Sequence, residues 1–328
     1  NGVGYTGIRV RGSDATRVNV TINGIPYNDS ESQGTFFVNV PDLTSSASQI
    51  LIQRGVGTSN NGAAAFGASV NVILKDPEEK FYVKTDDSYG SFNTYKYSAE
   101  IGSGKFWGNR LSVMGRYTHI NSDGYIDRAF SKLNSYNFTA LYEEGNTRIR
   151  LMAFGGKEKT YQAWNGIDRK TWETDPKFNY SGAIYDANWE NIVGFYDNET
   201  DNYRQNHYHL LWEQKFSDQW NLETTVHYTK GKGYYENYKQ GDPFARYNLP
   251  DFGGEEYSDF IRKKWLNNDF YGIVSTLYGK LGIVDVNFGA VANQYYGRHF
   301  GNVTGVFVPQ IDEYEYYRNR SVKNEVAG

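Results

Sequence analysis

The chain has 328 residues, with 34 Lys and Arg against 38 Asp and Glu, and its formal net charge is -4 at pH 7. Proteins that bind nucleic acid neutralise phosphates with a basic surface, so this balance argues against a nucleic-acid partner. No stretch approaches the roughly 18 consecutive apolar residues of a membrane-spanning helix, which excludes helical spans. The sequence contains no cysteine, which excludes disulfides and thiolate metal sites.

Aromatic residues make up 17% of the chain, while the whole apolar set reaches only 39%. A membrane-spanning β-barrel has this kind of composition, because its strands alternate apolar and polar residues and its aromatic residues gather at the two membrane interfaces. The composition is therefore compatible with a spanning barrel.

Residues 1–76 are rich in Gly, Val, Ile, Ala and Asn, and the composition changes near Pro77, where we place a domain boundary. Alternating apolar residues predict two hairpin-like strands, at 8–10 and 18–22. The Asn23-Gly24 pair after the second one favours a tight turn with positive φ angles.

Three more elements follow in this first part. Residues 41–46 predict a helix start with Asp or Ser as its cap. The apolar residues 50–52 predict a short buried strand, and 68–74 predict another strand.

Residues 80–328 show alternating segments of roughly the 9 to 11 residues that a tilted barrel strand needs. In the clearest one Trp220, Val226 and Tyr228 share one face, while Glu223 and His227 share the other. The strands are joined alternately by tight turns and by two long loops, near 155–205 and 231–265. This arrangement is typical of outer-membrane barrels.

A soluble β-sandwich or propeller also alternates along each strand. Such a core usually consists of Val, Leu and Ile, whereas Tyr brackets these strands, and the opposite faces carry many Glu, Asn, Thr and His residues. The composition favours the barrel over the soluble alternative.

Three stretches, in this order, resemble the plug domain of TonB-dependent outer-membrane receptors. They are GIRVRG (7–12), RVNVTINGIPYND (17–29) and QILIQRGVGTSNNGAAAFGASVNVILK (49–75). Val56, Phe66 and Ala68-Ser69 depart from the residues usual in the family, which suggests a sub-branch whose substrate does not transfer by analogy.

The resemblance implies an all-β dominated fold in which residues 1–76 form the C-terminal part of a small mixed α/β plug. Residues 80–328 are then the N-terminal part of a transmembrane antiparallel β-barrel. Barrels of this kind have about 22 strands, and 249 residues suffice for roughly ten. The chain is therefore expected to be a fragment of a longer protein.

In the family the arginines of the two Arg-Gly elements face the barrel wall, which carries over to Arg11 and Arg54. A guanidinium in a water-poor interface needs a carboxylate partner. The ion pair between such an arginine and a glutamate of the wall could act as a switch when the plug shifts, or it could simply hold the plug against the wall. Glu223 and Glu100 are weak local candidates for the glutamate.

The sequence has no recognisable catalytic motif, and we expect no enzyme activity, catalytic residue, cofactor or metal site. His207 and His209 share one strand face, but no further metal ligand is visible beside them. The adjacent acidic pairs, such as Asp86-Asp87, are expected in solvated turns.

The long loops carry aromatic residues beside Lys and Arg, which suit a planar, anionic, metal-chelating ligand such as a siderophore. Saccharides fit nearly as well, and an interfacial aromatic girdle with ordinary loop packing is the third interpretation. The candidate ligand-binding residues are Tyr161, Trp164, Trp172, Tyr234, Tyr235, Tyr238 and Arg246.

The resemblance implies energy-coupled import across the outer membrane of a Gram-negative bacterium, with a ferric siderophore or another iron complex as the first choice of ligand. The alternatives are import of an oligosaccharide or vitamin, or a non-transporting surface protein that binds glycans or mediates adhesion. The implied partners are an inner-membrane coupling protein of the TonB type, the small-molecule ligand and outer-membrane lipid. A surface lipoprotein is a further candidate.

Overall fold

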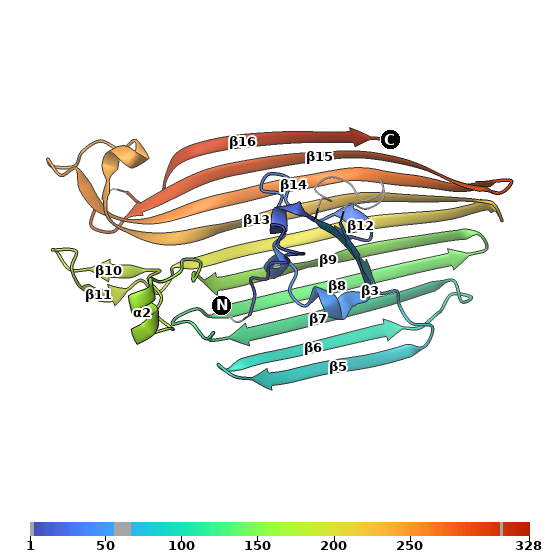
Figure 1. The fold of residues 1–328 in the computed structure, drawn as a ribbon, viewed down its shortest axis with the longest axis horizontal. Helices are drawn as coiled ribbons and strands as arrows, with labels where there is room; N and C mark the ends of the chain where they lie inside the picture. Colours follow the sequence, from blue (N-terminus) through green and yellow to red (C-terminus); the bar gives the residue numbers. More distant parts are fainter. Residues whose placement is uncertain (1–2, 56–66, 309–310) are drawn as a thin grey trace.

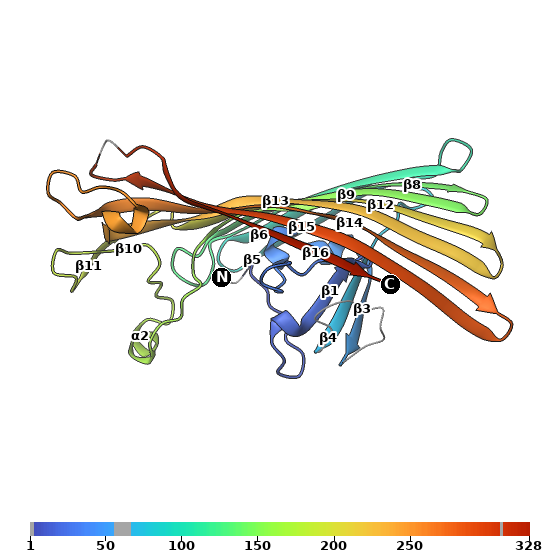
Figure 2. The same cartoon turned by 90° about the horizontal axis from the view of Figure 1, so that it is seen from above.

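The computed structural model describes residues 3–55, 67–308 and 311–328 of the chain. These residues form two main sheets, one of four strands and one of ten, and a separate two-stranded hairpin (Figure 1). We call residues 3–55 and 67–76 the plug and the ten-stranded sheet the wall. Figure 2 shows that the plug lies against one face of the wall, which we call the inner face. Within the described residues, no helix has both the length and the apolar character needed to cross a membrane.

The plug is a short mixed sheet in the order β2-β1-β4-β3. β1 pairs with β2 through the Asn23-Gly24 turn, whose φ angles are 52° and 78°, and β1 runs parallel to β4. The strands are β1 (Val18–Ile22), β2 (Ile25–Pro26), β3 (Ala47–Arg54) and β4 (Ala68–Leu74); the helical turns are η1 (Ala15–Arg17), η2 (Phe37–Asn39) and α1 (Leu43–Ser46).

The structure differs from the sequence-based prediction at three places in the plug. Residues 8–10 form no strand. Asp42 precedes α1 as expected, but its side chain does not cap the helix. Residues 50–52 are exposed rather than buried, because among the described elements β3 packs only beside its neighbour β4 and both of its faces stay uncovered.

The wall is antiparallel throughout, and its neighbouring strands follow one another along the chain, except that the separate hairpin is inserted between the fifth and sixth strands. Its strands are β5 (Phe81–Gly90), β6 (Thr94–Ser103), β7 (Leu111–Ser122), β8 (Ser131–Glu144), β9 (Thr147–Tyr161), β12 (Thr200–Ser217), β13 (Trp220–Pro243), β14 (Tyr257–Leu281), β15 (Val284–Gly305) and β16 (Tyr314–Ala327). The predicted partial barrel sheet of roughly ten strands is confirmed.

Several strands are longer than the sequence predicted. β9 continues to Tyr161 and β12 begins at Thr200, so the first long connection is 162–199, which holds α2 (Arg169–Thr174) and the hairpin β10 (Ala183–Tyr185) and β11 (Ile192–Phe195). The second is 244–256 and begins with η4 (Phe244–Tyr247). The ladder between β13 and β14 continues through polar and glycine positions, where the sequence shows no alternation of apolar and polar residues.

The two faces of the wall have inverted polarity compared with a soluble sheet. The side chains buried on the inner face include Arg116, Asn137 and Arg150, whereas the outer face exposes large apolar residues. Those exposed residues include Ile101, Phe138, Leu151, Tyr208, Leu210, Val226, Tyr271 and Ile273. Strands that alternate in this way present an apolar surface on one side and a polar one on the other.

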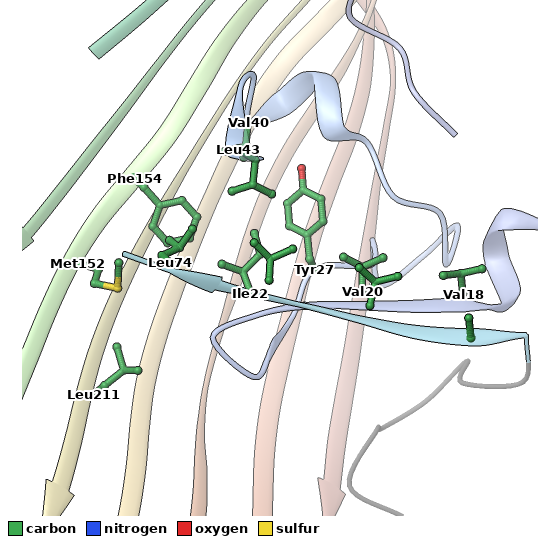
Figure 3. Close-up of a cluster of buried hydrophobic side chains, with 13 residues drawn as sticks. Val18, Val20, Ile22, Tyr27, Val40, Leu43, Leu74, Met152, Phe154 and Leu211 are labelled. Carbon is green, nitrogen blue, oxygen red and sulfur yellow. The ribbon is translucent and has the colours of Figure 1, made fainter. Parts of the chain in front are cut away.

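The hydrophobic core lies between the plug and the wall (Figure 3). Val20 and Ile22 of β1 and Leu74 of β4 pack in one cluster with Met152 and Phe154 of β9. Because both units contribute to a single core, burial of apolar surface holds the plug against the wall.

Candidate ligand-binding site

A cavity of about 810 Å³ lies between the plug and the inner face of the wall. The plug contributes residues between Tyr5 and Asn39, and the wall contributes side chains from β9 and from β12 to β16. The volume falls within the range of small-molecule sites. A ligand held here would touch both units at once.

Aromatic rings form much of the cavity surface. Trp164, in the connection after β9, meets Tyr5 of the plug and Tyr235 of β13 edge-to-face, with ring centroids 6.0 and 5.8 Å apart. Tyr234 lies beside Trp265, with ring centroids 4.4 Å apart. These rings offer planar apolar contact at a low cost in conformational entropy.

Glycines on β13 make room for the ring of Tyr203 on the neighbouring strand. A Cβ atom added at Gly231 would lie 1.9 Å from the Tyr203 hydroxyl, and one at Gly233 would lie 2.6 Å from its Cδ2. Any larger residue at these two positions would displace the ring. The glycines of 231–233 therefore position an aromatic side chain that lines the cavity.

A loop of the plug is hydrogen-bonded to β15 at one side of the cavity. Glu31 accepts hydrogen bonds from His299 Nε2 at 2.6 Å and from the Tyr295 hydroxyl at 2.8 Å. Burial alone would raise the pKa of Glu31, but the hydrogen bonds from Tyr295, Ser321 and His299 outweigh it and lower that pKa. Glu31 is therefore a carboxylate near neutral pH.

Another segment of the plug contacts β9 and β12. The Tyr5 hydroxyl donates to Asp201 Oδ2 at 2.5 Å, and Thr160 lies within 3.3 Å of the same hydroxyl. Burial raises the pKa of Tyr5, and the carboxylates of Glu158 and Asp201 raise it further. Tyr5 therefore keeps its proton and acts as a donor to Asp201.

Three of the seven ligand-binding residues expected from the sequence, Trp164, Tyr234 and Tyr235, line the cavity. The other four lie outside it. Tyr161 is buried and bonds to the carbonyls of Ser181 and Tyr196. Trp172 is 60% exposed on α2.

The last two of those residues are engaged in local contacts. The Tyr238 hydroxyl donates to Asp259, and Arg246 pairs with Asp242. Of the Lys and Arg side chains in the described residues, only Lys264 lines the cavity. Lys232 and Lys263 do not line it, although they lie 5.7 and 5.4 Å from the ring centroids of Trp265 and Tyr234.

The sequence analysis did not select several residues that line the cavity. Among them are Tyr5, Glu31, Glu158, Asp201, Tyr203, Trp265, Tyr295 and His299. Apart from Trp265, those on the wall lie on the inner face of strands that the alternation had located in part. These wall residues line the same cavity as Tyr5 and Glu31 only because the plug docks against the wall. The local sequence does not indicate how the plug docks.

Arg11 and Arg54 are both exposed, and no hydrogen bond or ion pair joins either guanidinium to the described part of the wall. Arg54 ends β3, the edge strand of the plug sheet. Of the two candidate partners, Glu100 accepts a hydrogen bond from Tyr82 and lies 3.9 Å from Lys75. The contact expected for the two arginines stays a prediction.

Ion pairs of the opposite polarity join plug and wall in this structure. Asp42 of the plug pairs with Arg116 of β7 and lies 3.2 Å from Lys96 of β6. Arg116 also donates to Ser46 Oγ of the plug at 2.8 Å. The residue that was expected to cap α1 therefore binds the wall instead.

The pair His207 and His209 lies beneath the plug. The ring of His207 stacks on Phe154 at 4.7 Å between centroids, and Phe154 belongs to the shared core. Within the described ranges, no group of three or more His, Cys, Asp or Glu residues is arranged to hold a metal ion.

No protein-family model matches the chain, and no curated protein does. Solved structures match it in fold. The unliganded ferric citrate transporter FecA aligns with a TM-score of 0.70 at 14% identity, over 98% of this chain and 46% of that one.

Two further solved structures align in the same way. The pyoverdine outer membrane receptor FpvA from Pseudomonas aeruginosa PAO1 has a TM-score of 0.60 at 12% identity, over 98% of this chain and 45% of that one. The ferric-catecholate import receptor Fiu from K12 E. coli, in its closed form, has a TM-score of 0.53 at 14% identity, over 99% and 57%. The chain spans about half the length of these structures and has their fold.

Proposed function

We propose that the chain is part of an outer-membrane receptor that captures a small ligand and imports it with energy delivered by an inner-membrane protein of the TonB type. The first choice of ligand is an iron complex of the siderophore class. Support comes from the fold shared with a ferric citrate transporter and with pyoverdine and ferric-catecholate receptors. The aromatic cavity supplies the candidate binding site.

The observation that carries the proposal is that the cavity is built from both units. Tyr5 and Glu31 belong to the plug, while Trp164, Asp201 and His299 belong to the wall or its connections. Any displacement of the plug would remove part of the binding surface. Energy that moves the plug would therefore also release the ligand, as import requires.

The apolar outer face supports a location in the outer membrane of a Gram-negative bacterium. Leu210, Val226 and Ile273 are each more than 40% exposed on that face. Exposed aliphatic side chains on consecutive strands form a surface that lipid would cover. In the same proposal, residues 1–76 act as the plug and 80–328 as barrel wall, with Arg11 and Arg54 facing wall strands beyond this chain.

A growth assay tests the proposal. Cells that lack the full-length receptor are complemented with the wild type, with Trp164→Ala in the cavity, or with Trp172→Ala on α2 as the matched control. We expect Trp164→Ala to raise the concentration of ferric ligand needed for growth by about tenfold, since one stacked aromatic contributes on the order of 1–3 kcal/mol.

The control Trp172→Ala is expected to grow like the wild type, and deletion of the coupling protein should abolish growth on the same ligand. Growth that depends on an oligosaccharide but on no iron complex would refute the choice of ligand and keep the importer. Growth that needs neither the receptor nor the coupling protein under any of these nutrient limitations would refute import itself.

A further inference from the structure

Glu158, Asp201, Gln205 and Asn268 line the cavity, and we call this group of side chains the floor. Three of the four have a buried oxygen that accepts no hydrogen bond from the described residues. Glu158 of β9 is 2% exposed, and its Oε2 has no hydrogen-bond partner among the described residues. The side-chain carbonyl oxygens of Gln205 and Asn268, which line the same cavity, are also buried and unpartnered. A buried acceptor without a donor costs free energy, so this floor is suited to a ligand that supplies donors.

Asp201 gives the floor a second carboxylate close to Glu158. The two residues lie on adjacent strands, with Thr160 opposite Asp201 and Tyr203 opposite Glu158 in the ladder. Residues related in this diagonal way have side chains on the same face of the sheet. The Tyr5 hydroxyl donates one hydrogen bond to Asp201, and no ion pair joins either carboxylate to a described Lys, Arg or His.

The remaining charges around the cavity do not offset this pair. Asp29 is used within the plug, where it accepts hydrogen bonds from Ser32 and from the backbone N–H of Glu31. Glu31 is held by His299 and Tyr295. Lys264 is the only described Lys or Arg side chain that lines the cavity, and it lies over the ring of Tyr235.

Building on the importer proposed above, we propose that the Glu158–Asp201 floor binds an ammonium or guanidinium group, so that the receptor selects a ligand carrying a positive charge. Such a group brings several N–H donors to the unpartnered acceptors, and its positive charge favours the ionised form of the two carboxyl groups. The neighbouring rings of Tyr5 and Trp164 add cation–π attraction.

A pair of ligands that differ only in this charge provides the test. Ferrioxamine B is a ferric hydroxamate complex with one free ammonium group, and acetylation of that amine gives a neutral complex of nearly the same shape. Binding of each to the purified full-length receptor is followed by quenching of its intrinsic fluorescence. We expect ferrioxamine B to bind about tenfold or more tightly, because a hydrogen bond to a charged group contributes on the order of 1.5–3 kcal/mol.

Variants then assign the preference to the floor. In Glu158→Gln, which keeps the size of the side chain and removes its charge, the preference for the ammonium complex should fall to about threefold or less. Glu223→Gln on β13, outside the cavity, is the control and should keep the preference of the wild type. Asp201→Asn serves as the second floor variant if Glu158→Gln folds poorly.

Equal affinity of the wild-type receptor for the two complexes would overturn the inference. Tighter binding of ferric citrate than of ferrioxamine B would also overturn it, as would the absence of binding of either hydroxamate complex at millimolar concentration. A preference that persists in both floor variants would overturn the assignment to Glu158 and Asp201. If one of these results appears while growth on another iron complex still depends on Trp164, the floor assignment fails and the importer stands. If growth on that complex does not depend on Trp164 either, both the floor assignment and the importer proposal fail.

Discussion

Replacing Arg116 by methionine is expected to weaken the attachment of the plug to the wall by about 3 kcal/mol. The side chains of Arg116 and Asp42 are only 5% and 9% exposed, and removal of one partner of a buried ion pair costs about 3–5 kcal/mol because the other charge stays desolvated. The lower end of this range applies because Lys96 still faces Asp42. The measurement is urea unfolding of the plug in the folded full-length receptor, reported by a fluorophore at exposed Thr16.

Two further variants show whether the ion pair is the cause. Arg110→Met, just before β7, removes an arginine whose pair with Glu144 is exposed, and such pairs contribute only about 0–1 kcal/mol. Adding Asp42→Asn to Arg116→Met should recover part of the loss, since no unpaired carboxylate remains, and asparagine tolerates the φ of 56° at this position. Equal unfolding midpoints for the Arg116 and Arg110 variants would contradict this account of the interface.

Replacing Phe154 by alanine is expected to destabilise the docked plug by about 3–5 kcal/mol, the usual cost of removing a large aromatic side chain from a core. Phe154 is 1% exposed in the cluster shared by plug and wall. Its ring also stacks on His207. Hydrogen exchange measured by mass spectrometry should show faster exchange in β1 and β4 of the plug, while the strands of the wall keep their protection.

Phe138→Ala on β8 is the matched control for this second substitution. Phe138 pairs with Ala153 in the same ladder, but its ring is exposed on the outer face. The exchange rates of the plug should therefore stay at wild-type values. Unchanged plug exchange in Phe154→Ala would mean that the shared core does not hold the plug in place.

The sequence predicted the wall well, because a strand's period of two fixes which side chains share a face. Val226 and Tyr228 were placed opposite His227, and in the structure the first two are exposed and His227 is buried. The Asn23-Gly24 turn was also predicted correctly, since its φ angles depend on local residue type.

Features that depend on long-range packing were not predicted. Apolar composition suggested burial of residues 50–52, although none of the described elements covers either face of β3 and these residues are exposed. Asp86-Asp87 was expected in a turn, yet both residues lie within β5 and Asp86 pairs with Lys96 on the adjacent strand. Acidic residues are compatible with a strand when a cation lies on its neighbour.

The candidate site was predicted only in part, for a related reason. Trp164, Tyr234 and Tyr235 were found because aromatic residues cluster in and beside the long connections. Contacts such as that between Tyr5 and Asp201 join residues 196 positions apart. Neither alternation nor composition carries information about such pairs, so the acidic floor could be recognised only from the docked arrangement.

We expect the wall to turn its apolar face to lipid and its polar face to the plug. Nitroxide labels at Leu210 and Val226 of the outer face, and at Asp218 in the exposed turn between β12 and β13, test it in the full-length receptor reconstituted in bilayers. We expect the two outer labels to collide readily with molecular oxygen and hardly at all with a water-soluble nickel complex, while the Asp218 label meets the nickel complex freely. Nickel accessibility at Leu210 and Val226 equal to that at Asp218 would contradict the claim.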